Sequence, residues 1–405
     1  MSNLELPAVV LDCGTGYTKL GYSGNVEPCS IFPTVISCSG GVKQRGSSSA
    51  SPLADLDFPI GYEALQVSAG NTRALLNHGA VNSWDDMESF WQQCIFRKLR
   101  CDPANHRFLL TEPPMNPPES RERTAEVMFE SFGVAGLYIG VQAVLALAGS
   151  FASQGLSGRP LTGTVVDSGD GVTHVVPVVD GFVAGSCVRS LPLAGASVTS
   201  FVQRLLRERG EPIPPELSME AARQVKEAHC YVCQDMAKEF ARHEDDPKKH
   251  HRKHSMADPR SGQDVSFDVG YERFLGPEIF FTPEIVNESV SPLPRVVDDA
   301  IQGCGIDARR SLYGNIVLSG GSTMFRDFGR RMRKDIKGII ASRASAGAQE
   351  VDVNVVAHYN QRCAVWFGGS VAASMPSFPS VCHSRADYEE HGPRICRRNI
   401  VFTDA

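Results

Sequence analysis

The chain has 405 residues, of which 42% are hydrophobic, 21% charged and 8% aromatic, and its formal net charge is −6. This is ordinary globular composition, with enough length for two or three domains or one large bilobed fold. The mild acidic excess argues against a nucleic-acid groove and against a polybasic membrane surface. The 12 cysteines are scattered, and no basic segment followed by an apolar run opens the chain, so we expect a reducing, cytosolic location.

The first expected element is a short apolar run, residues 6–11, which ends at Asp12 in a glycine-rich turn. The run is typical of a buried strand that enters a hairpin. In the turn, Asp12-Cys-Gly-Thr-Gly-Tyr-Thr-Lys19, two glycines let backbone N–H groups approach an anion, and Thr15 adds a hydroxyl donor. Lys19 supplies a positive charge for a phosphate. Because Asp12 would repel a bare phosphate, its carboxylate indicates a cation held through water, as is usual for Mg²⁺.

Residues 131–158 contain no charged side chain, and their length alone would allow a membrane span. Glycines, serines and glutamines interrupt the segment, however, and its more apolar part, residues 134–148, is shorter than the roughly 20 residues that a span needs. We therefore expect a buried strand followed by a helix. Gln142, a strongly polar residue in this apolar helix, is either a buried, hydrogen-bonded glutamine or a residue that orients an attacking water.

A second apolar strand, residues 164–166, ends at Asp167 in a turn that repeats the first one. The string Thr-Val-Val-Asp-Ser-Gly-Asp-Gly-Val-Thr-His parallels Val-Val-Leu-Asp-Cys-Gly-Thr-Gly-Tyr-Thr-Lys. A duplication at this long spacing indicates two related α/β lobes rather than a solenoid, whose repeats are much shorter. One such turn alone is compatible with an ordinary hairpin, whereas the pair predicts two loops that clamp a polyphosphate from both sides. His174 is either a plain sheet residue or part of a proton path.

Helical patterns alternate with these strands along the chain, and such alternation indicates an α/β fold. The clearest helical patterns cover residues 122–132, 198–208 and 221–240. Cys230 and Cys233 fall within the last pattern. Because their surroundings are not those of a thioredoxin-like motif, we expect two packed thiols rather than a redox pair.

Two further glycine turns, each expected after an apolar strand, lie in the last quarter of the chain. The first is Gly320-Gly-Ser-Thr-Met324, after the strand at residues 316–319, and the second lies within residues 364–370. The first turn is either a place where the backbone approaches a ligand or a tight strand-to-helix turn.

Three segments are expected to be surface insertions, namely residues 39–51, 242–261 and 341–350. The first is rich in glycine and serine, a composition typical of flexible segments. The second contains Lys248-Lys-His-His-Arg-Lys-His254, which resembles a metal or polyanion site. It lacks cysteines at zinc-finger spacing and has acidic neighbours, so a solvated loop is the favoured interpretation.

The two turns and Gly320-Gly321 resemble the phosphate 1, phosphate 2 and adenosine motifs of the superfamily of actin, sugar kinases and 70-kDa chaperone ATPases. Within it, the chain resembles the actin family nearly from end to end. Actin-like segments include His78-Gly-Ala-Val-Asn-Ser-Trp-Asp-Asp-Met87, Thr111-Glu-Pro-Pro-Met-Asn116, Val141-Gln-Ala-Val-Leu145, Val225-Lys-Glu227 and Leu312-Tyr-Gly-Asn-Ile-Val-Leu-Ser-Gly-Gly321. The resemblance implies an α/β, actin-like ATPase fold with two duplicated lobes around a nucleotide cleft. The first lobe would comprise residues 1–155 (actin subdomains 1 and 2), completed by 355–405, and the second residues 156–354 (subdomains 3 and 4).

The same resemblance implies which residues bind ATP and Mg²⁺. Asp12, Gln142 and Asp167 would order the waters around Mg²⁺, and Gln142 and His174 would position the water for hydrolysis. Arg362 stands where actin has a lysine near the adenine, and its planar guanidinium is able to stack there. The residues that would contact the nucleotide are Thr15, Gly16, Tyr17, Lys19, Ser168, Gly169, Asp170, Gly171, Val172, Lys226, Glu227, Gly320, Gly321, Thr323, Met324, Phe325 and Arg362.

Longer strings resemble the branch of the actin family that nucleates branched filaments. They include Asp268-Val-Gly-Tyr-Glu-Arg-Phe-Leu-Gly-Pro-Glu-Ile-Phe-Phe281 and Gly320-Gly-Ser-Thr-Met-Phe-Arg-Asp-Phe-Gly-Arg-Arg331. This resemblance implies a nucleotide-regulated subunit of the cytoplasmic actin cytoskeleton, which mimics an actin protomer at the branch and is at most a slow ATPase. Its partners would be actin-related protein 2, the accessory subunits of the branching complex, actin filaments and nucleation-promoting factors, with no nucleic acid and no membrane insertion.

The chain departs from the family pattern in three places. Ala196 and Ser197 stand where the family has Arg and Asp. Residues 39–51 do not resemble the actin loop that lodges in a neighbouring filament subunit, and residues 242–261 form an insertion that actin lacks. These changes argue against the alternative of a conventional filament-forming actin. No carboxylate base for a sugar stands out, which argues against a sugar kinase.

Overall fold

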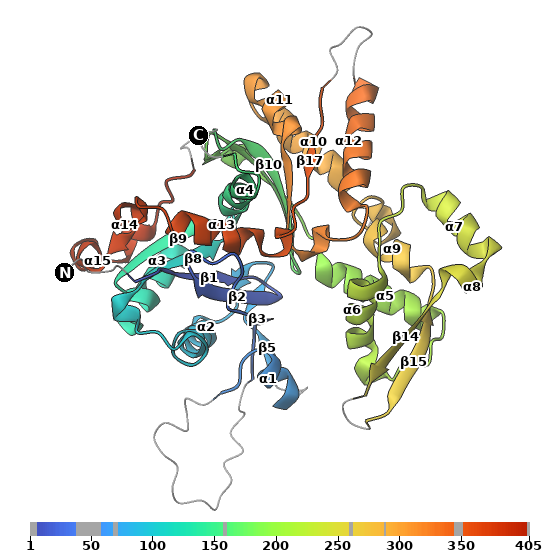
Figure 1. Ribbon diagram of the computed structural model, residues 1–405, viewed down its shortest axis with the longest axis horizontal. Coiled ribbons are helices and arrows are strands. Elements are labelled where there is room, and N and C mark those ends of the chain that lie inside the picture. Colours follow the sequence, from blue (N-terminus) through green and yellow to red (C-terminus); the bar gives the residue numbers. More distant parts are fainter. Residues whose placement is uncertain are drawn as a thin grey trace, which may run out of the picture. The chain divides into compact units, whose positions relative to one another are not determined.

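The computed structural model describes residues 6–37, 58–67, 72–156, 160–258, 262–286, 289–343 and 351–402. They form two compact units (Figure 1). Unit 1 comprises Met1–Leu161, Asp180–Gly185 and Cys363–Ala405, and unit 2 comprises Thr162–Val179 and Ser186–Arg362. The sequence-based division placed its boundaries at residues 155 and 355. The expected insertion at residues 39–51 and most of the one at 341–350 lie outside the described residues.

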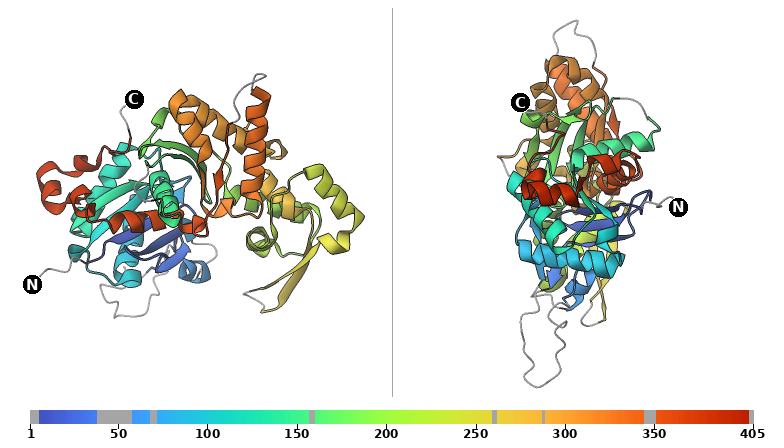
Figure 2. Two further views of the ribbon diagram at one scale, coloured as in Figure 1. Left: turned by 45° about the horizontal axis from the view of Figure 1, so that its top comes forward. Right: turned by 90° about the vertical axis from the view of Figure 1, so that its left-hand side faces the viewer.

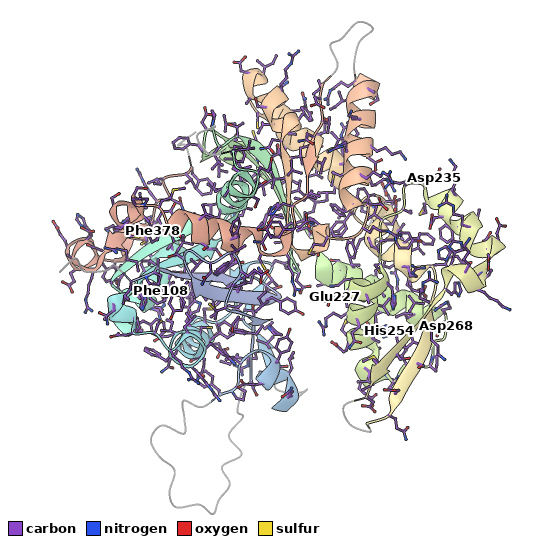
Figure 3. All side chains as sticks on the ribbon, in the orientation of Figure 1. Phe108, Glu227, Asp235, His254, Asp268 and Phe378 are labelled. Carbon is purple, nitrogen blue, oxygen red and sulfur yellow. The ribbon has the colours of Figure 1, made fainter. Side chains whose placement is uncertain are left out.

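Unit 1 is built on a six-stranded mixed sheet. In spatial order its strands are β18 (His383–Ser384), β9 (Gly136–Val141), β8 (Arg107–Glu112), β1 (Val9–Cys13), β2 (Tyr17–Tyr22) and β3 (Ser30–Pro33). The predicted first hairpin is β1–β2, which is antiparallel, whereas β1, β8 and β9 are parallel. Phe108 is fully buried on β8 (Figure 3). Because parallel strands end at the same edge of a sheet, the residues that follow β1, β8 and β9 are brought together there.

Two helices of unit 1, α4 (Gln142–Ser153) and α13 (Ala364–Ala373), pack closely against each other. The strand β9 followed by α4 confirms the strand and helix predicted for residues 134–148. The glycine turn predicted within residues 364–370 is wrong, because these residues form α13. A Cβ on Gly368 would lie 1.8 Å from the Leu145 backbone oxygen, so this glycine allows two helices to touch rather than a chain to turn.

Unit 2 repeats the arrangement of strands found in unit 1. Its strands β11 (Thr173–Val179), β10 (Gly163–Ser168), β16 (Ile316–Ser319) and β17 (Val355–Val356) lie in this spatial order, and β13 (Arg189–Leu191) also pairs with β11. The hairpin β10–β11 is antiparallel and β10 is parallel to β16, just as β1 pairs with β2 and β8. The predicted second strand and its turn are therefore confirmed. Helices α5 (Gly195–Glu208), α6 (Ser218–His229), α10 (Leu293–Gly303), α11 (Ile306–Gly314) and α12 (Phe328–Arg343) belong to the same unit.

The single helix predicted for residues 221–240 is wrong, because α6 ends at His229 and α7 (Met236–Asp245) is a separate helix. The N–H of Tyr231 donates instead to the Arg273 backbone oxygen at 2.8 Å. A hydrogen bond to a distant segment thus replaces the helical one. Cys230 and Cys233 lie in this break rather than in a helix, and both are free thiols whose pKa burial raises to about 12.

The solvated loop predicted for residues 242–261 is also wrong over its described part. The segment contains the end of α7, then α8 (Pro247–His250) and β14 (Arg252–Ala257), which pairs with β15 (Asp264–Val269), drawn in yellow in Figures 1 and 2. The reason is that histidines act here as aromatic core residues. His243 is fully buried, and its ring lies 4.9 Å from that of His250 and 5.1 Å from that of Phe274.

The remaining helices and strands are short. They are β4 (Val35–Ser37), α1 (Tyr62–Val67), β5 (Thr72–Ala74), β6 (Leu76–Asn77), β7 (Ala80–Val81), α2 (Trp84–Gln92), α3 (Pro118–Glu126), β12 (Phe182–Val183), α9 (Glu272–Glu278), α14 (Phe378–Val381) and α15 (Arg385–His391). In the part of the chain that the structure describes, no helix combines the length and the apolar character needed to cross a membrane.

Candidate functional site

The carboxylate of Asp12 lies at the carboxyl end of β1 and is 2% exposed. Lys19, its neighbour in the hairpin register, donates Nζ to Oδ2 at 2.8 Å, and Thr111 on β8 donates Oγ1 to Oδ1 at 2.6 Å. Gln142, the first residue of α4, donates Nε2 to Thr111 Oγ1 at 3.5 Å. Unit 1 therefore brings together Asp12, Lys19 and Gln142 through Thr111, which the sequence did not single out as a site residue.

The turn after Asp12 is fixed by hydrogen bonds to its backbone. The Gly14 N–H donates to the Tyr17 backbone oxygen at 3.1 Å, and the hydroxyl of Thr34 donates to the Gly14 oxygen at 2.7 Å. The Thr34 N–H donates to the Gly16 oxygen. Thr15 Oγ1 accepts from the Gly79 N–H at 3.1 Å, and a hydroxyl that accepts a bond keeps its own hydrogen for donation. The predicted phosphate residues of this turn are thus held in a rigid loop.

Asp167 takes the same place in unit 2 that Asp12 takes in unit 1. It lies opposite His174 across the hairpin and beside Ser319 on the parallel strand β16. The next residue, Ser168, is fully buried, and its hydroxyl lies 2.7 Å from that of Thr173. Thr173 donates its single hydrogen to the Leu193 oxygen at 2.6 Å, so Ser168 must donate to Thr173. The Ser168 hydroxyl therefore stabilises the hairpin.

His174 is buried beside Asp167 in the register and has an unusual environment. Its Nδ1 lies 2.8 Å from Ser190 Oγ, whereas its Nε2 is buried without a hydrogen-bond partner. Burial lowers the pKa of His174 to about 4, since desolvation disfavours the charged imidazolium. The ring is therefore neutral at physiological pH. A neutral imidazole is able to hold or accept a proton but supplies no positive charge.

The turn that follows Asp167, residues 168–172, is called the second loop. The first turn of α5 contacts it through backbone groups. The Gly195 N–H donates to the Gly169 oxygen at 3.0 Å, and the Ala196 N–H donates to the Asp170 oxygen at 2.9 Å. Ala196 is exposed, and Ser197 Oγ accepts from the Ala194 N–H at 3.4 Å. These two residues stand where the sequence departs from the actin pattern, and main-chain groups, which do not depend on the side chains, make the contacts of this turn with the loop.

Lys226 on α6 also lies where the first turn of α5 meets the second loop. Its Nζ donates to the Gly195 oxygen at 3.1 Å and lies 4.0 Å from Asp170 Oδ1. Burial lowers the pKa of Lys226, and the nearby Asp170 opposes this shift. Glu227, labelled on α6 in Figure 3, is more exposed and pairs with Arg223 at 3.5 Å. Unit 2 thus joins Lys226 to the second loop, whereas Glu227 extends from the same helix toward solvent.

The turn after β16 is pressed against the second loop. Gly320 has a φ of +87°, and a Cβ at this position would lie 2.2 Å from the Ser168 backbone oxygen, so only glycine fits. Ser322 Oγ donates to the Gly169 oxygen at 2.6 Å. The glycine is therefore required by the packing of this turn against the second loop, and the approach of its backbone to a ligand stays a prediction. Met324 is half exposed, and Arg362 is exposed in the turn Gln361–Cys363.

The donor groups around Asp12 suit a hydrated Mg²⁺. A buried carboxylate and an amide carbonyl are oxygen donors of the kind that Mg²⁺ and its water shell prefer. Within the described residues, no group of three or more His, Cys, Asp or Glu side chains is placed to hold a metal ion directly. A magnesium ion here would accordingly rely on water and on phosphate oxygens for most of its ligands.

Comparisons with known proteins identify the family of the chain. The family model described as Actin matches residues 3–223 and 217–401. The chain is 53% identical to Actin-related protein 3 of Drosophila melanogaster over 411 residues, which cover 98% of each chain. It is also 53% identical to Actin-related protein 3 of Oryza sativa, subspecies indica and japonica, over 427 residues and 99% of each chain. The chain therefore belongs to the actin family and has its α/β actin-like fold.

Proposed function

We propose that this chain is an ATP-binding, actin-related subunit of a complex that nucleates branched actin filaments. The observation that carries the proposal is its 53% identity, along nearly the full length of both chains, to proteins named Actin-related protein 3. Its partners would be actin-related protein 2, the accessory subunits of that complex, actin filaments and nucleation-promoting factors. Work at a filament branch would place it in the actin cytoskeleton.

ATP binding is supported by the duplicated hairpins, each of which ends in an aspartate and a glycine-rich turn. Backbone N–H groups of the turns after Asp12 and Asp167 would hold the phosphates, and Lys19 would add a positive charge. Mg²⁺, held through water by Asp12, Gln142 and Asp167, would neutralise charge on the β- and γ-phosphates. The turn at Gly320 would contact the adenosine.

Hydrolysis would be slow and would serve regulation rather than metabolism. Gln142 Nε2 donates to Thr111, so its amide oxygen remains able to orient a water molecule. His174 is neutral and has an unpartnered Nε2, so it would accept or relay a proton. Because phosphoryl transfer to water depends mainly on positioning and charge stabilisation, a binding protein hydrolyses ATP slowly without being a dedicated enzyme.

The test is purification of the tagged full chain from native cytosol, followed by quantification of the proteins that co-purify. We expect actin-related protein 2 and the accessory subunits in stoichiometric amounts, and an assembly that accelerates actin polymerisation and forms branches. Their absence would contradict the nucleation role. Polymerisation of the isolated chain into filaments of its own would support a conventional filament-forming actin instead.

A further inference from the structure

A buried glutamine, Gln361, lies directly behind the turn that begins at Gly320. Its side chain is 6% exposed. Its backbone oxygen accepts the Gly320 N–H at 2.9 Å, and its side-chain Nε2 donates to Thr323 Oγ1 at 3.2 Å. No motif of the expected site includes this glutamine, so it could not be predicted from the sequence. Gln361 therefore contacts the turn at two points, one through its main chain and one through its side chain.

The hydroxyl of Thr323 fixes the direction of these bonds. The shorter of its two carbonyl contacts is with the Gly320 oxygen, to which it donates at 2.7 Å. A hydroxyl has a single hydrogen, so Thr323 must accept from the amide nitrogen of Gln361. The N–H and the C=O of Gly320 are thus both held, the first by Gln361 directly and the second by Gln361 through Thr323.

This support matters because Gly320 is the tightest contact between the turn and the second loop. Gly320 lies against the Ser168 backbone, where even a Cβ would not fit, and Ser322 bonds to the Gly169 oxygen at 2.6 Å. The loop therefore holds one side of the turn while Gln361 holds the other. Loss of the Gln361 side chain would let the turn move away from the loop without removing any group that faces the loop.

We propose that Gln361 is a positioning residue for the nucleoside part of ATP. The inference rests on the proposed ATP binding and goes further, because it assigns a role to a residue outside the expected contacts. Gln361 acts through Thr323 and Gly320. It sets the position of the turn at Gly320, which would contact the adenosine, relative to the second loop, which would contact the phosphates. Ligands that carry an adenosine benefit from this position, whereas a bare polyphosphate does not.

The experiment compares the affinities of the full chain, in its native assembly and with Mg²⁺, for ATP and for inorganic tripolyphosphate. Gln361→Met keeps the length of the side chain and removes the donor alone, whereas Thr323→Val, of similar shape, removes both the acceptor and the hydroxyl that donates to the Gly320 oxygen. We expect Gln361→Met to weaken ATP binding about 10-fold, the value of one hydrogen bond, and Thr323→Val to weaken it at least as much, with tripolyphosphate affinity within about twofold of wild type in both. The double variant should lose little more than Thr323→Val alone, because the bond between the two side chains is already absent there.

A matched control is Gln203→Met on α5, where Nε2 donates to Ser218 Oγ at 2.7 Å within the same unit. It should change neither affinity. Wild-type ATP affinity in Gln361→Met, or an equal loss for ATP and tripolyphosphate, would overturn the positioning role while leaving ATP binding intact. A wild-type chain that binds no ATP would overturn the proposed function together with this inference. Thermal unfolding of each variant without nucleotide separates a local change in the turn from loss of the fold. Thr323→Val removes the same bond from its other end.

Discussion

The hairpins β1–β2 and β10–β11 have the same backbone arrangement but differ in the residue opposite their aspartate in the hairpin register. Asp12 lies opposite Lys19, which is charged and forms an ion pair at 2.8 Å, whereas Asp167 lies opposite His174, which burial keeps neutral. Duplication has preserved the strand, the turn and the parallel neighbour. The charge of the opposite residue is not preserved. The first hairpin contains the ion pair of Asp12 and Lys19, and the second contains the neutral imidazole of His174, which becomes charged when it binds a proton.

The two loops should differ most in how much free energy of unfolding is lost when an aspartate is removed, and the larger loss is expected for Asp12. Asp12→Ala removes the carboxylate that pairs with Lys19, whose side chain is 15% exposed, and that accepts the hydrogen bond from Thr111. Loss of one member of a buried ion pair costs about 3–5 kcal/mol, and we expect a fall of that order in the free energy of unfolding in urea. The matched control is Asp170→Ala in the second loop, whose side chain is 39% exposed and whose lysine is 4.0 Å away. It should cost less than about 1 kcal/mol, and equal losses would contradict the comparison.

The hairpin that carries the second loop should make the stability of the fold depend on pH. The folded-state pKa of His174 is about 4 and its unfolded value about 6.5, so the unfolded chain binds the proton first as the pH falls. The stability from His174 is complete above about pH 6.5 and is lost as the pH falls toward 4. Between about pH 7.5 and about pH 5 this amounts to about 2 kcal/mol.

His174→Gln should reduce this pH dependence, measured as urea unfolding at both pH values. It should not abolish it, since burial also lowers the pKa of His229, His243 and His254. His391→Gln, a change at an exposed histidine of α15, is the control and should leave the dependence as it is. An unaltered pH profile in His174→Gln would mean that the ring is not held neutral in the fold.

The smallest expected difference concerns the first glycine of each turn. A Cβ on Gly14 would lie 3.0 Å from the Tyr17 oxygen, while a Cβ on Gly169 would meet no atom within 4 Å. We expect Gly14→Ala to lower the melting temperature by a few degrees, about 1 kcal/mol, and Gly169→Ala to change it little. The opposite order would show that the second turn, not the first, has the tighter backbone.

The local features of the fold could be predicted from the sequence because they depend on nearby residues. The two hairpins and the pair β9–α4 follow from apolar runs, turn residues and periodicity. The resemblance to the actin family rests on long strings and is confirmed by the comparisons. Contacts between distant segments were not predictable in this way. Thr111 becomes the neighbour of Asp12 only through the pairing of β1 with β8.

The wrong predictions have the same physical origin. The pattern Gly368-Gly369 is equally suited to a turn and to close helix packing, and only the position of Leu145 decides between them. The break after His229 depends on a hydrogen bond from Tyr231 to Arg273, far along the chain. Histidines at residues 242–261 read as polar in sequence, yet the burial of His243 makes it a core residue.

The most direct test of the central claim is equilibrium binding of ATP to the full chain, with Mg²⁺ and with the metal chelated. We expect one ATP per chain, with an affinity that falls when Mg²⁺ is removed. Asp12→Asn keeps the size of the side chain and removes its charge, so it should weaken binding and reduce the dependence on metal. An absence of ATP binding, or an Asp12→Asn variant with unchanged affinity and unchanged metal dependence, would contradict it.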